Sequence, residues 1–205
     1  MGETSWEDFI EHRILAPVEM IDLNVRNSQS TRGENAATPH ARVDGRVRRL
    51  QPFASDNSNP AGGINSSAAD MAKWMRVLLR EGKLEGGSRL YSEETARELV
   101  TLVTPIPIPE PDPELSSQRM SFRGYGLGLN LHDYRGRKVV NHTGGLPRLF
   151  SKLTMVPELE LGVVTNQESG DAFNAITCHV LDHCLGGPTT DWVAAYRSQP
   201  RAILN

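Results

Sequence analysis

Apolar residues in the first half of the chain recur three and four positions apart, which is the spacing of one face of an α-helix. Such stretches follow Ser5, Ser67 and Ser92, and serine is a preferred N-cap because its hydroxyl accepts a hydrogen bond from the first turn. The first helix is expected to end before Pro17 and the second at Gly82. The residues expected to face inward are Trp6, Phe9, Ile10 and Ile14, then Met71, Trp74, Met75, Leu78 and Leu79, and finally Ala96, Leu99, Val100 and Val103.

The second half of the chain changes to the two-residue alternation of β-strands. Short turns separate the strand-like runs, which favours antiparallel hairpins in one sheet. Residues 171–185 predict a helix packed on a face of that sheet, and residues 191–196 a shorter helix. Helices followed by an antiparallel sheet indicate an α+β fold. The predicted strands are 125–131, 138–141, 150–156 and 159–165, and the predicted turns are 133–137, 144–148 and 157–158.

Two segments show neither the helical nor the strand spacing of apolar residues. Residues 24–62 are polar and rich in Asn, Ser and Arg, so we expect a long, partly ordered excursion. Residues 104–113 hold five prolines, which exclude both a helix and a central strand, so we expect a loop or a lid. We accordingly expect residues 1–113 to form a helical region with long polar loops. Residues 114–205 would supply the antiparallel strands and the C-terminal helix of an α/β core.

Composition and charge exclude several classes of function. The 205 residues are 38% hydrophobic and 23% charged, with a net charge of -3, which is typical of an ordinary globular domain. Basic residues are scattered apart from Arg46, Arg48 and Arg49, so neither nucleic acid nor an anionic membrane is an expected partner. No apolar run approaches the roughly 20 residues of a membrane span. The first residues do not resemble a signal peptide, and we make no prediction of the compartment.

Cys178 and Cys184 are the two cysteines, and both fall in the predicted helix 171–185. Six residues of helix rise about 9 Å, which exceeds the roughly 7 Å limit for a disulfide. We therefore expect free core thiols, which disfavours an oxidising compartment.

Two histidine-containing patterns are candidates for chemistry. His142-Thr143-Gly144-Gly145 follows a predicted strand, and on local grounds alone such a string is typical of a strand end with a glycine turn. His179 and His183 have the i, i+4 spacing of zinc ligands. The alternative is that both lie on the rim of a packed helix, and we favour it because no carboxylate stands between them in the usual zinc pattern. We expect no metal and no cofactor.

Five blocks of sequence, in this order, resemble the class C β-lactamase-like family, which includes penicillin-binding proteins and serine esterases. The resemblance implies a β-lactamase/transpeptidase-like fold and a serine hydrolase. The blocks are Pro60-Ala61-Gly62-Gly63-Ile64-Asn65-Ser66-Ser67, Asp70-Met71-Ala72-Lys73-Trp74, Tyr125-Gly126-Leu127-Gly128, His142-Thr143-Gly144-Gly145 and Val163-Val164-Thr165-Asn166.

The chemistry of this family uses a Ser-x-x-Lys helix start, a Tyr-x-Asn loop and a Lys-Thr-Gly-like strand. No serine in this chain is followed three residues later by lysine, and the resemblance begins after the Tyr-x-Asn motif. We therefore expect the nucleophile to be absent from this chain and to lie on an N-terminal part outside it. Ser55-Asp56-Asn57 spells the Ser-Asp-Asn string of class A enzymes, but it stands in a polar loop, where a turn cap is the better interpretation.

The third element is present as His142-Thr143-Gly144, with histidine where many relatives have lysine. The resemblance implies that the N–H of Gly145 is one donor of the oxyanion hole. It also implies that His142, Thr143, Gly144 and Asn166 bind substrate. A histidine, with a reference pKa of about 6.5, is only partly charged at neutral pH. This favours an ester or amide over a β-lactam or peptidoglycan carboxylate.

Two functions of different classes follow. The first is the C-terminal portion of a serine hydrolase that acts through an acyl-serine on a small-molecule or peptide-like acyl substrate. The second is a truncated relative without chemistry, which acts as a binding or interaction module. In either case the chain alone is expected to be inactive, and its own N-terminal segment or a second copy is an expected partner.

Overall fold

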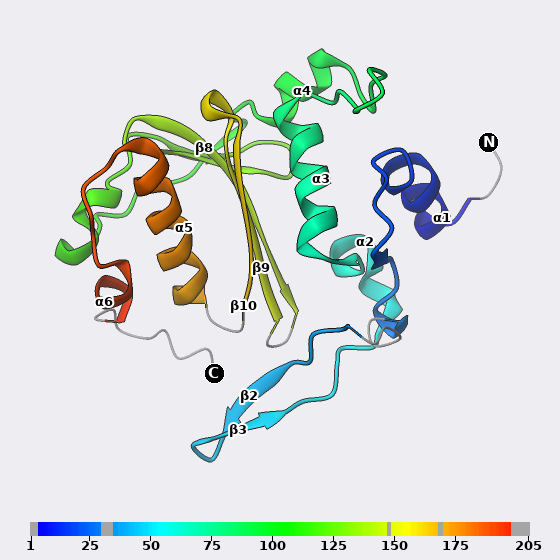
Figure 1. Ribbon diagram of the computed structural model, residues 1–205, viewed down its shortest axis with the longest axis horizontal. Coiled ribbons are helices and arrows are strands. Elements are labelled where there is room, and N and C mark those ends of the chain that lie inside the picture. The colour runs from blue at the N-terminus through cyan, green and yellow to red at the C-terminus, as the bar shows by residue number, and fades with distance from the viewer. Residues whose placement is uncertain (1–3, 30–34, 147–148, 168–169, 198–205) are drawn as a thin grey trace.

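The computed structural model describes residues 4–29, 35–146, 149–167 and 170–197, and its largest unit is a six-stranded antiparallel sheet (Figure 1). The strands lie in the order β10-β9-β8-β7-β6-β5, so each pairs with its neighbour in the sequence. This meander confirms the predicted antiparallel sheet. The strands are β5 (Thr104–Pro105), β6 (Arg123–Tyr125), β7 (Asn130–Tyr134), β8 (Arg137–Leu146), β9 (Leu149–Val156) and β10 (Leu161–Gln167).

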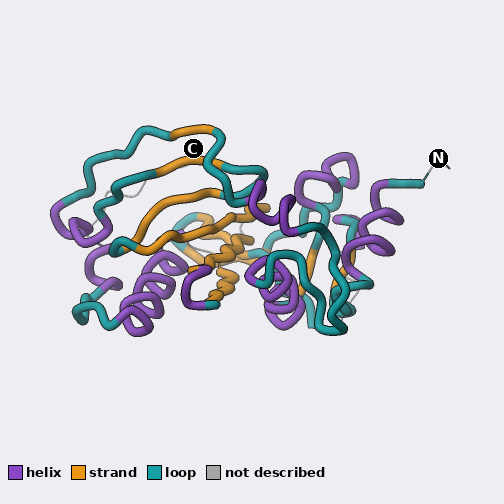
Figure 2. Tube along the Cα trace, turned by 90° about the horizontal axis from the view of Figure 1, so that it is seen from above, coloured by secondary structure: helices purple, strands orange, loops and turns teal. Residues whose placement is uncertain are grey.

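Helices lie against both faces of the sheet, which confirms the α+β arrangement (Figures 1 and 2). Helices α5 (Gly170–Leu185) and α6 (Trp192–Arg197) cover one face, and α3 (Ala68–Leu79) lies on the other. Successive residues of a strand point to opposite faces, so each strand contributes to two cores. In β8, for example, Val139 belongs to the core under α5, whereas Val140 packs with Met75 of α3.

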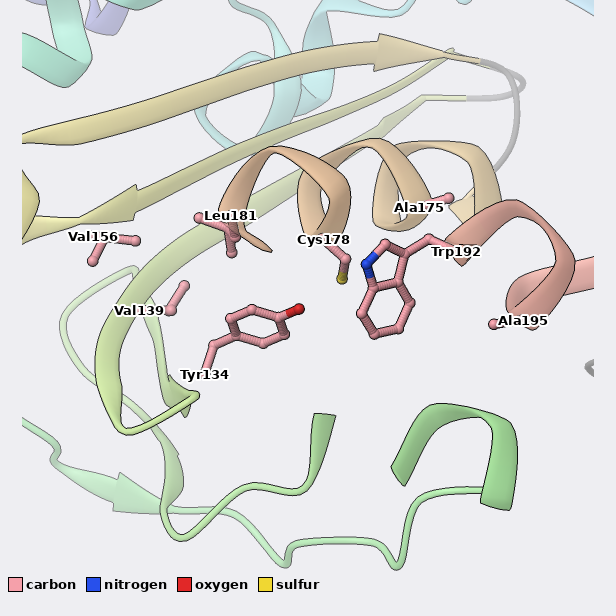
Figure 3. Close-up of a cluster of buried hydrophobic side chains, with 8 residues drawn as sticks. All are labelled: Tyr134, Val139, Val156, Ala175, Cys178, Leu181, Trp192 and Ala195. Carbon is pink, nitrogen blue, oxygen red and sulfur yellow. The ribbon is translucent and has the colours of Figure 1, made fainter. Parts of the chain in front are cut away.

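The core under α5 is formed by the sheet and the two C-terminal helices (Figure 3). Val139 and Val156 from the strands are fully buried, and Leu181 of α5 and Trp192 of α6 close over them. Cys178 lies in the same cluster. The alternation in β8 and β9 and the helical spacing of α5 therefore bury the same layer of side chains.

Asp182 of α5 joins three elements at the edge of this core. It accepts hydrogen bonds from the Tyr134 hydroxyl at 2.6 Å, from Arg135 Nε at 2.6 Å and from Trp192 Nε1 at 2.9 Å. Burial by itself raises the pKa of Asp182, but the hydrogen bonds from Arg135, Tyr134 and Trp192 outweigh it and leave the pKa below its usual value. A charged aspartate therefore holds α5 to the β7–β8 turn and to α6.

The predicted helix starts in the first half of the chain are confirmed. The hydroxyls of Ser5, Ser67 and Ser92 accept hydrogen bonds from the third residue on, at 3.1, 3.2 and 3.1 Å. Two of the predicted inward residues are exposed instead, Phe9 at 48% and Val103 at 59%. The helix that follows Ser92 has ended before Val103, which donates its N–H to the carbonyl of Tyr125 as the chain approaches the sheet. The helices are α1 (Trp6–Ile10), extended by the π-helical turn η1 (Glu11–Leu15), then α3, and then α4 (Glu93–Leu99).

The single strand predicted over 125–131 is wrong, because the chain turns there. β6 ends at Tyr125, the N–H of Gly126 donates to the carbonyl of Leu129 at 2.8 Å, and β7 begins at Asn130. Gly128 takes a φ of +81°, which glycine adopts without strain and an extended strand does not contain. The motif Tyr125-Gly126-Leu127-Gly128 is therefore a hairpin turn rather than a strand. Because apolar residues continue through this turn, the hydrophobic pattern does not show where β6 ends and β7 begins.

The segment 24–62 is more ordered than its composition predicts. Strands β2 (His40–Val43) and β3 (Arg46–Arg49) form a two-stranded hairpin that projects from the molecule (Figure 1). Asp44 and Gly45 take φ values of 52° and 74°, as a tight hairpin turn requires. The smaller elements around it are β1 (Leu23–Asn24) paired with β4 (Asn65–Ser66), the short 3-10 turns η2 (Asn27–Gln29) and η3 (Asp56–Ser58), and α2 (Asn59–Gly62).

Both cysteines are free, and they differ in exposure. Cys178 is buried in the core under α5, whereas Cys184 is exposed, so only the first is the expected core thiol. Within the described ranges, none of the helices is both long and apolar enough to cross a bilayer.

Candidate active site

Strand β8 has one open edge over its second half. It pairs with β9 from Val140 to Leu146, but with β7 only as far as Asn141. From His142 to Leu146, no strand among the described residues therefore occupies the other edge. Backbone N–H and C=O groups of a strand point alternately to its two edges. Some of those groups in this segment, which we call the open-edge segment, consequently face away from β9.

Burial changes at the point where β7 ends. Val139, Val140 and Asn141 are buried, whereas the next four residues, His142 to Gly145, are exposed. These four residues line a cleft of about 1240 Å³ that extends from the strand towards α3. The structure thus brings His142, Thr143, Gly144 and Gly145 to one cleft.

Asn166 lies on the same row of the sheet, two strands away. Its position in β10 is opposite Ser151 in β9, which is in turn opposite Gly144 in β8. At a strand spacing of about 4.8 Å, its backbone is roughly 10 Å from that of Gly144. The side chain of Asn166 is outside the described part of the structure, so its predicted contact with substrate stays a prediction.

His142 and Thr143 lie on opposite faces of β8. His142 follows the alternation of Val140, which faces α3, and its ring centroid is 6.4 Å from that of Tyr125. Thr143 follows Val139 on the α5 face, where it is directly opposite Lys152 of β9. A ligand can touch both side chains only by lying along the open edge between the two faces.

The two glycines of the segment are constrained differently. A Cβ on Gly144 would be 2.5 Å from the hydroxyl oxygen of Ser151. A Cβ on Gly145 would be 3.6 Å from the ring of Phe150, an ordinary contact. A side chain at 144 would therefore displace the Ser151 hydroxyl, whereas at 145 there is room for a Cβ.

The floor of the cleft is apolar. Residues of α3 and of the sheet face that packs against α3 form the floor. It is therefore continuous with the hydrophobic core between α3 and the sheet. The cleft consequently offers a polar strand edge at one side and an apolar surface below. The floor residues are Met71, Trp74 and Leu78 of α3 together with Leu99, Leu129, Leu153 and Val164.

Three described serines line the cleft, and the hydroxyl of each contacts a nearby residue of the chain or of the neighbouring strand. Ser67 Oγ accepts from the N–H of Asp70 as a helix cap, and Ser66 Oγ donates to the carbonyl of Ser67 at 3.5 Å. Ser151 Oγ lies over Gly144. Within the described ranges, none of the three hydroxyls is hydrogen-bonded to a lysine or histidine that could act as its base.

Ser55-Asp56-Asn57 forms a structural turn outside the cleft lining. Asp56 accepts hydrogen bonds from Ser28, from its N–H at 2.9 Å and from its hydroxyl at 2.7 Å. The hydrogen bonds from Ser28 lower the pKa of Asp56. Ser55 precedes η3 without a side-chain cap, and its carbonyl accepts from Asn27 Nδ2 at 3.3 Å. The string therefore ties two loops together.

The helix histidines do not converge with other ligands. His179 and His183 are both exposed, and the described residues contain no group of three His, Cys, Asp or Glu side chains placed to hold a metal ion.

Lys152 is a site residue that the sequence analysis missed. It lines the cleft beside Thr143, and burial lowers its pKa. The available signal was the position of Lys152 within an apolar strand: it shares the alternation of Thr154 and Val156 and so points inward.

Comparisons with known proteins agree with this architecture. The family model described as Beta-lactamase matches residues 1–177. A curated relative, "Unguisins hydrolase ungD" of Aspergillus violaceofuscus, is 33% identical over 148 residues, which cover 66% of this chain and 26% of that protein.

Among solved structures, an octameric penicillin-binding protein homologue from Pyrococcus abyssi has a TM-score of 0.73 at 24% identity, covering 90% of this chain and 38% of that one. A class C β-lactamase from Rhodobacter sphaeroides has a TM-score of 0.62 at 15% identity, covering 89% and 55%. These similarities show a β-lactamase/transpeptidase-like fold. They also show that the chain spans about a quarter of the curated relative and 38% to 55% of these two structures.

Proposed function

This chain belongs to the Beta-lactamase family, and from that premise we propose that it is the substrate-binding portion of a serine hydrolase whose nucleophile lies on polypeptide outside these 205 residues. The observation that carries the proposal is the open-edge segment of β8, exposed along one side of a large cleft. An extended acyl substrate can add to such an edge as a further strand.

The edge would act on the substrate carbonyl through its backbone. The N–H of Gly145 donates to the carbonyl oxygen together with the N–H of the nucleophile, and both stabilise the negative charge that develops there. The serine oxygen attacks the carbonyl carbon and releases an alcohol or amine. Water then cleaves the acyl-serine, so that one acid leaves and the serine is restored.

The apolar floor supports an external source of the nucleophile. A helix that packs on Trp74 and Leu78 would bury the floor, and a serine on its end nearest His142 would face the open edge.

An ester or amide is the proposed substrate class. His142 stands where many relatives have lysine, and a histidine does not supply the permanent cation that would favour a substrate carboxylate. Relatives by structure include a D-stereospecific amidohydrolase from Streptomyces, with a TM-score of 0.63 at 22% identity. Amide cleavage fits the same acyl-serine chemistry.

The second candidate is a non-catalytic binding module. It is favoured by one observation, that no described serine of the cleft is hydrogen-bonded to a lysine or histidine. In that case the open edge still binds an extended peptide, but no covalent step follows.

Probe labelling tests the proposal. The purified chain should neither hydrolyse p-nitrophenyl esters or nitrocefin nor be labelled by a fluorophosphonate, and adding the polypeptide encoded upstream should restore labelling on a serine of that polypeptide. A covalent adduct on any serine of this chain, formed without the upstream polypeptide, would overturn the assignment. If the completed protein is unlabelled yet binds acyl peptides, the binding module is the correct function.

A further inference from the structure

A second cavity lies on the opposite face of the sheet from α3. It has a volume of about 350 Å³ and is lined by residues of β6, β7, β8 and β9, of α5 and α6, and of the 3-10 turn η4 (Pro113–Gln118). We call it the α5-side cavity. At one end its wall is apolar, formed in part by Val139 and Leu181 of the core in Figure 3.

The other end of this cavity holds a cation. Lys152 points to the α5 face of β9, where Nζ donates a hydrogen bond to Asn174 Oδ1 at 2.7 Å and lies 5.3 Å from the ring centroid of Phe173. An ammonium group has three donors, and Asn174 takes one of them. Two donors of Lys152 therefore have no hydrogen-bond acceptor among the described residues.

No carboxylate among the described residues pairs with Lys152. Asp182, on the same helix as Asn174, accepts instead from Tyr134, Arg135 and Trp192. The described ion pairs are all formed by other cations. A largely buried charge without an opposite charge is costly, so the cavity favours an anion.

Thr154 provides a second, independent sign of a ligand. Its side chain is 2% exposed and lines the cavity, yet its hydroxyl has no hydrogen-bond partner within the described part of the chain. Thr154 is two residues from Lys152 on the same face of β9, so their Cβ atoms are about 7 Å apart. A carboxylate between the two can accept a hydrogen bond from each.

The imidazole ring of His132 adds no positive charge to the cavity lining near neutral pH. Burial and the charge of Lys152 lower the pKa of His132 to about 4, so its ring is uncharged near pH 7. One of its nitrogens is 3.2 Å from the side-chain amide of Asn141, which also lines the cavity. The cavity lining thus combines two cations, Lys152 and Arg123, with neutral polar groups, which favours an anionic ligand such as a carboxylate.

We propose that the α5-side cavity binds a small organic monocarboxylic acid, with its carboxylate between Lys152 and Thr154 and its apolar body against Val139 and Leu181. The cavity volume of 350 Å³ leaves space for such a body beyond the carboxylate itself. The inference does not depend on the proposed hydrolase function, because Lys152 and Thr154 would bind a carboxylate without any acyl transfer, even though Lys152 also lines the cleft.

Calorimetric titration of the 205-residue chain with phenylacetate tests the proposal. Phenylacetate should bind saturably, whereas phenylacetamide, its uncharged analogue, should bind at least about tenfold more weakly, because it lacks the charge-assisted hydrogen bond. Lys152→Met should abolish the preference for the acid. Lys138→Met is the matched control: Lys138 is also partly buried, but it donates to the carbonyl of Val100 and lies outside the cavity lining, so phenylacetate binding should be unchanged.

Thr154→Val separates binding from folding. Valine has nearly the shape of threonine and removes a hydroxyl without a partner, so the unliganded variant should melt at the same temperature as wild type or higher. Its affinity for phenylacetate should nevertheless fall about tenfold, since one hydrogen bond to a carboxylate is lost. The proposal would be overturned if wild type bound phenylacetate and phenylacetamide with equal affinity. It would also be overturned if neither Lys152→Met nor Thr154→Val lowered the affinity for phenylacetate.

Discussion

At the scale of single residues, Gly144 is explained by its neighbour across the sheet. The position that a Cβ would take is 2.5 Å from the Ser151 hydroxyl oxygen but 3.9 Å from the Ser151 Cβ. The conflict is therefore with one movable oxygen rather than with the backbone. This distinguishes a residue kept small by the fold from Gly145, where the fold itself imposes no such limit.

Gly144→Ala should lower the free energy of unfolding by about 1 kcal/mol, because the Ser151 hydroxyl must leave its preferred rotamer. In a Ser151→Ala background the same change should cost nothing measurable. Gly145→Ala is the matched control and should leave stability within about 0.5 kcal/mol of wild type. Urea unfolding of wild type, Gly144→Ala, Ser151→Ala and the double variant measures the coupling, and equal costs of Gly144→Ala with and without the Ser151 hydroxyl would contradict this explanation.

Thr143→Val should slow acyl transfer by about tenfold in the protein completed with its upstream polypeptide, corresponding to about 1.4 kcal/mol for one lost hydrogen bond. The side chain is exposed on the open-edge segment, so the melting temperature should not change. Thr104→Val, at an exposed position of β5, provides the control. Steady-state kinetics on a p-nitrophenyl ester is the measurement, and unaltered kcat/KM would remove Thr143 from the site.

At the scale of elements, the side-chain network of Asp182 connects α5, α6 and the β7–β8 turn. Asp182→Asn should destabilise the chain by about 3 kcal/mol, since it removes a buried carboxylate that accepts three hydrogen bonds and leaves the partly buried Arg135 without its charge partner. Glu158→Gln removes an exposed partner of Arg137 instead and should cost less than about 1 kcal/mol.

The contribution of Asp182 should also depend on pH. Because its pKa is lower in the folded chain than in the unfolded chain, its stabilisation is present above the unfolded value of about 3.9 and is lost as pH falls below it. The stability difference between wild type and Asp182→Asn should therefore shrink between about pH 5 and pH 2. A difference that stays constant over that range in chemical denaturation would show that the charge plays no part.

The elements that could be predicted from sequence are those with a buried face. Helix α3 has both a serine cap and a continuous apolar stripe, and β9 alternates apolar and polar positions against two cores. The hairpin β2–β3 has neither, because every residue of β3 is exposed, and its one signal is the Asp44-Gly45 pair. A strand without a buried face leaves no hydrophobic period to detect.

The residues of the candidate site also differ in whether the sequence alone could identify them. His142 to Gly145 could be found because a motif marks them, whereas Lys152 carries no motif and acquires its place only when β9 pairs with β8. Its partner Asn174 lies on another element, 22 residues away. Contacts across elements depend on register, which local sequence does not encode.

At the scale of the whole molecule, the cleft leaves an apolar floor uncovered in the chain by itself. Patches of this kind commonly mark interaction surfaces. The chain alone should therefore self-associate or bind the dye ANS, and adding the upstream polypeptide should suppress both. Sedimentation velocity and ANS fluorescence measure this, and Trp74→Lys, which charges the floor, should reduce self-association. A chain that stays monomeric and does not increase ANS fluorescence would contradict the presence of an uncovered apolar floor.

The open edge of β8 also bears on chirality. Backbone hydrogen bonds along a strand edge do not depend on the handedness of the bound residue, but its side chain must project to one face of the sheet or the other. Inverting the α-carbon of a fully extended residue, with its backbone unchanged, moves the side chain towards the opposite face. Here one face presents His142 and the apolar floor beneath α3, and the other presents Thr143 with Lys152. Mirror-image substrates aligned on the same backbone would thus place their side chains in chemically unlike surroundings, so the two faces of a single strand are enough to distinguish left from right.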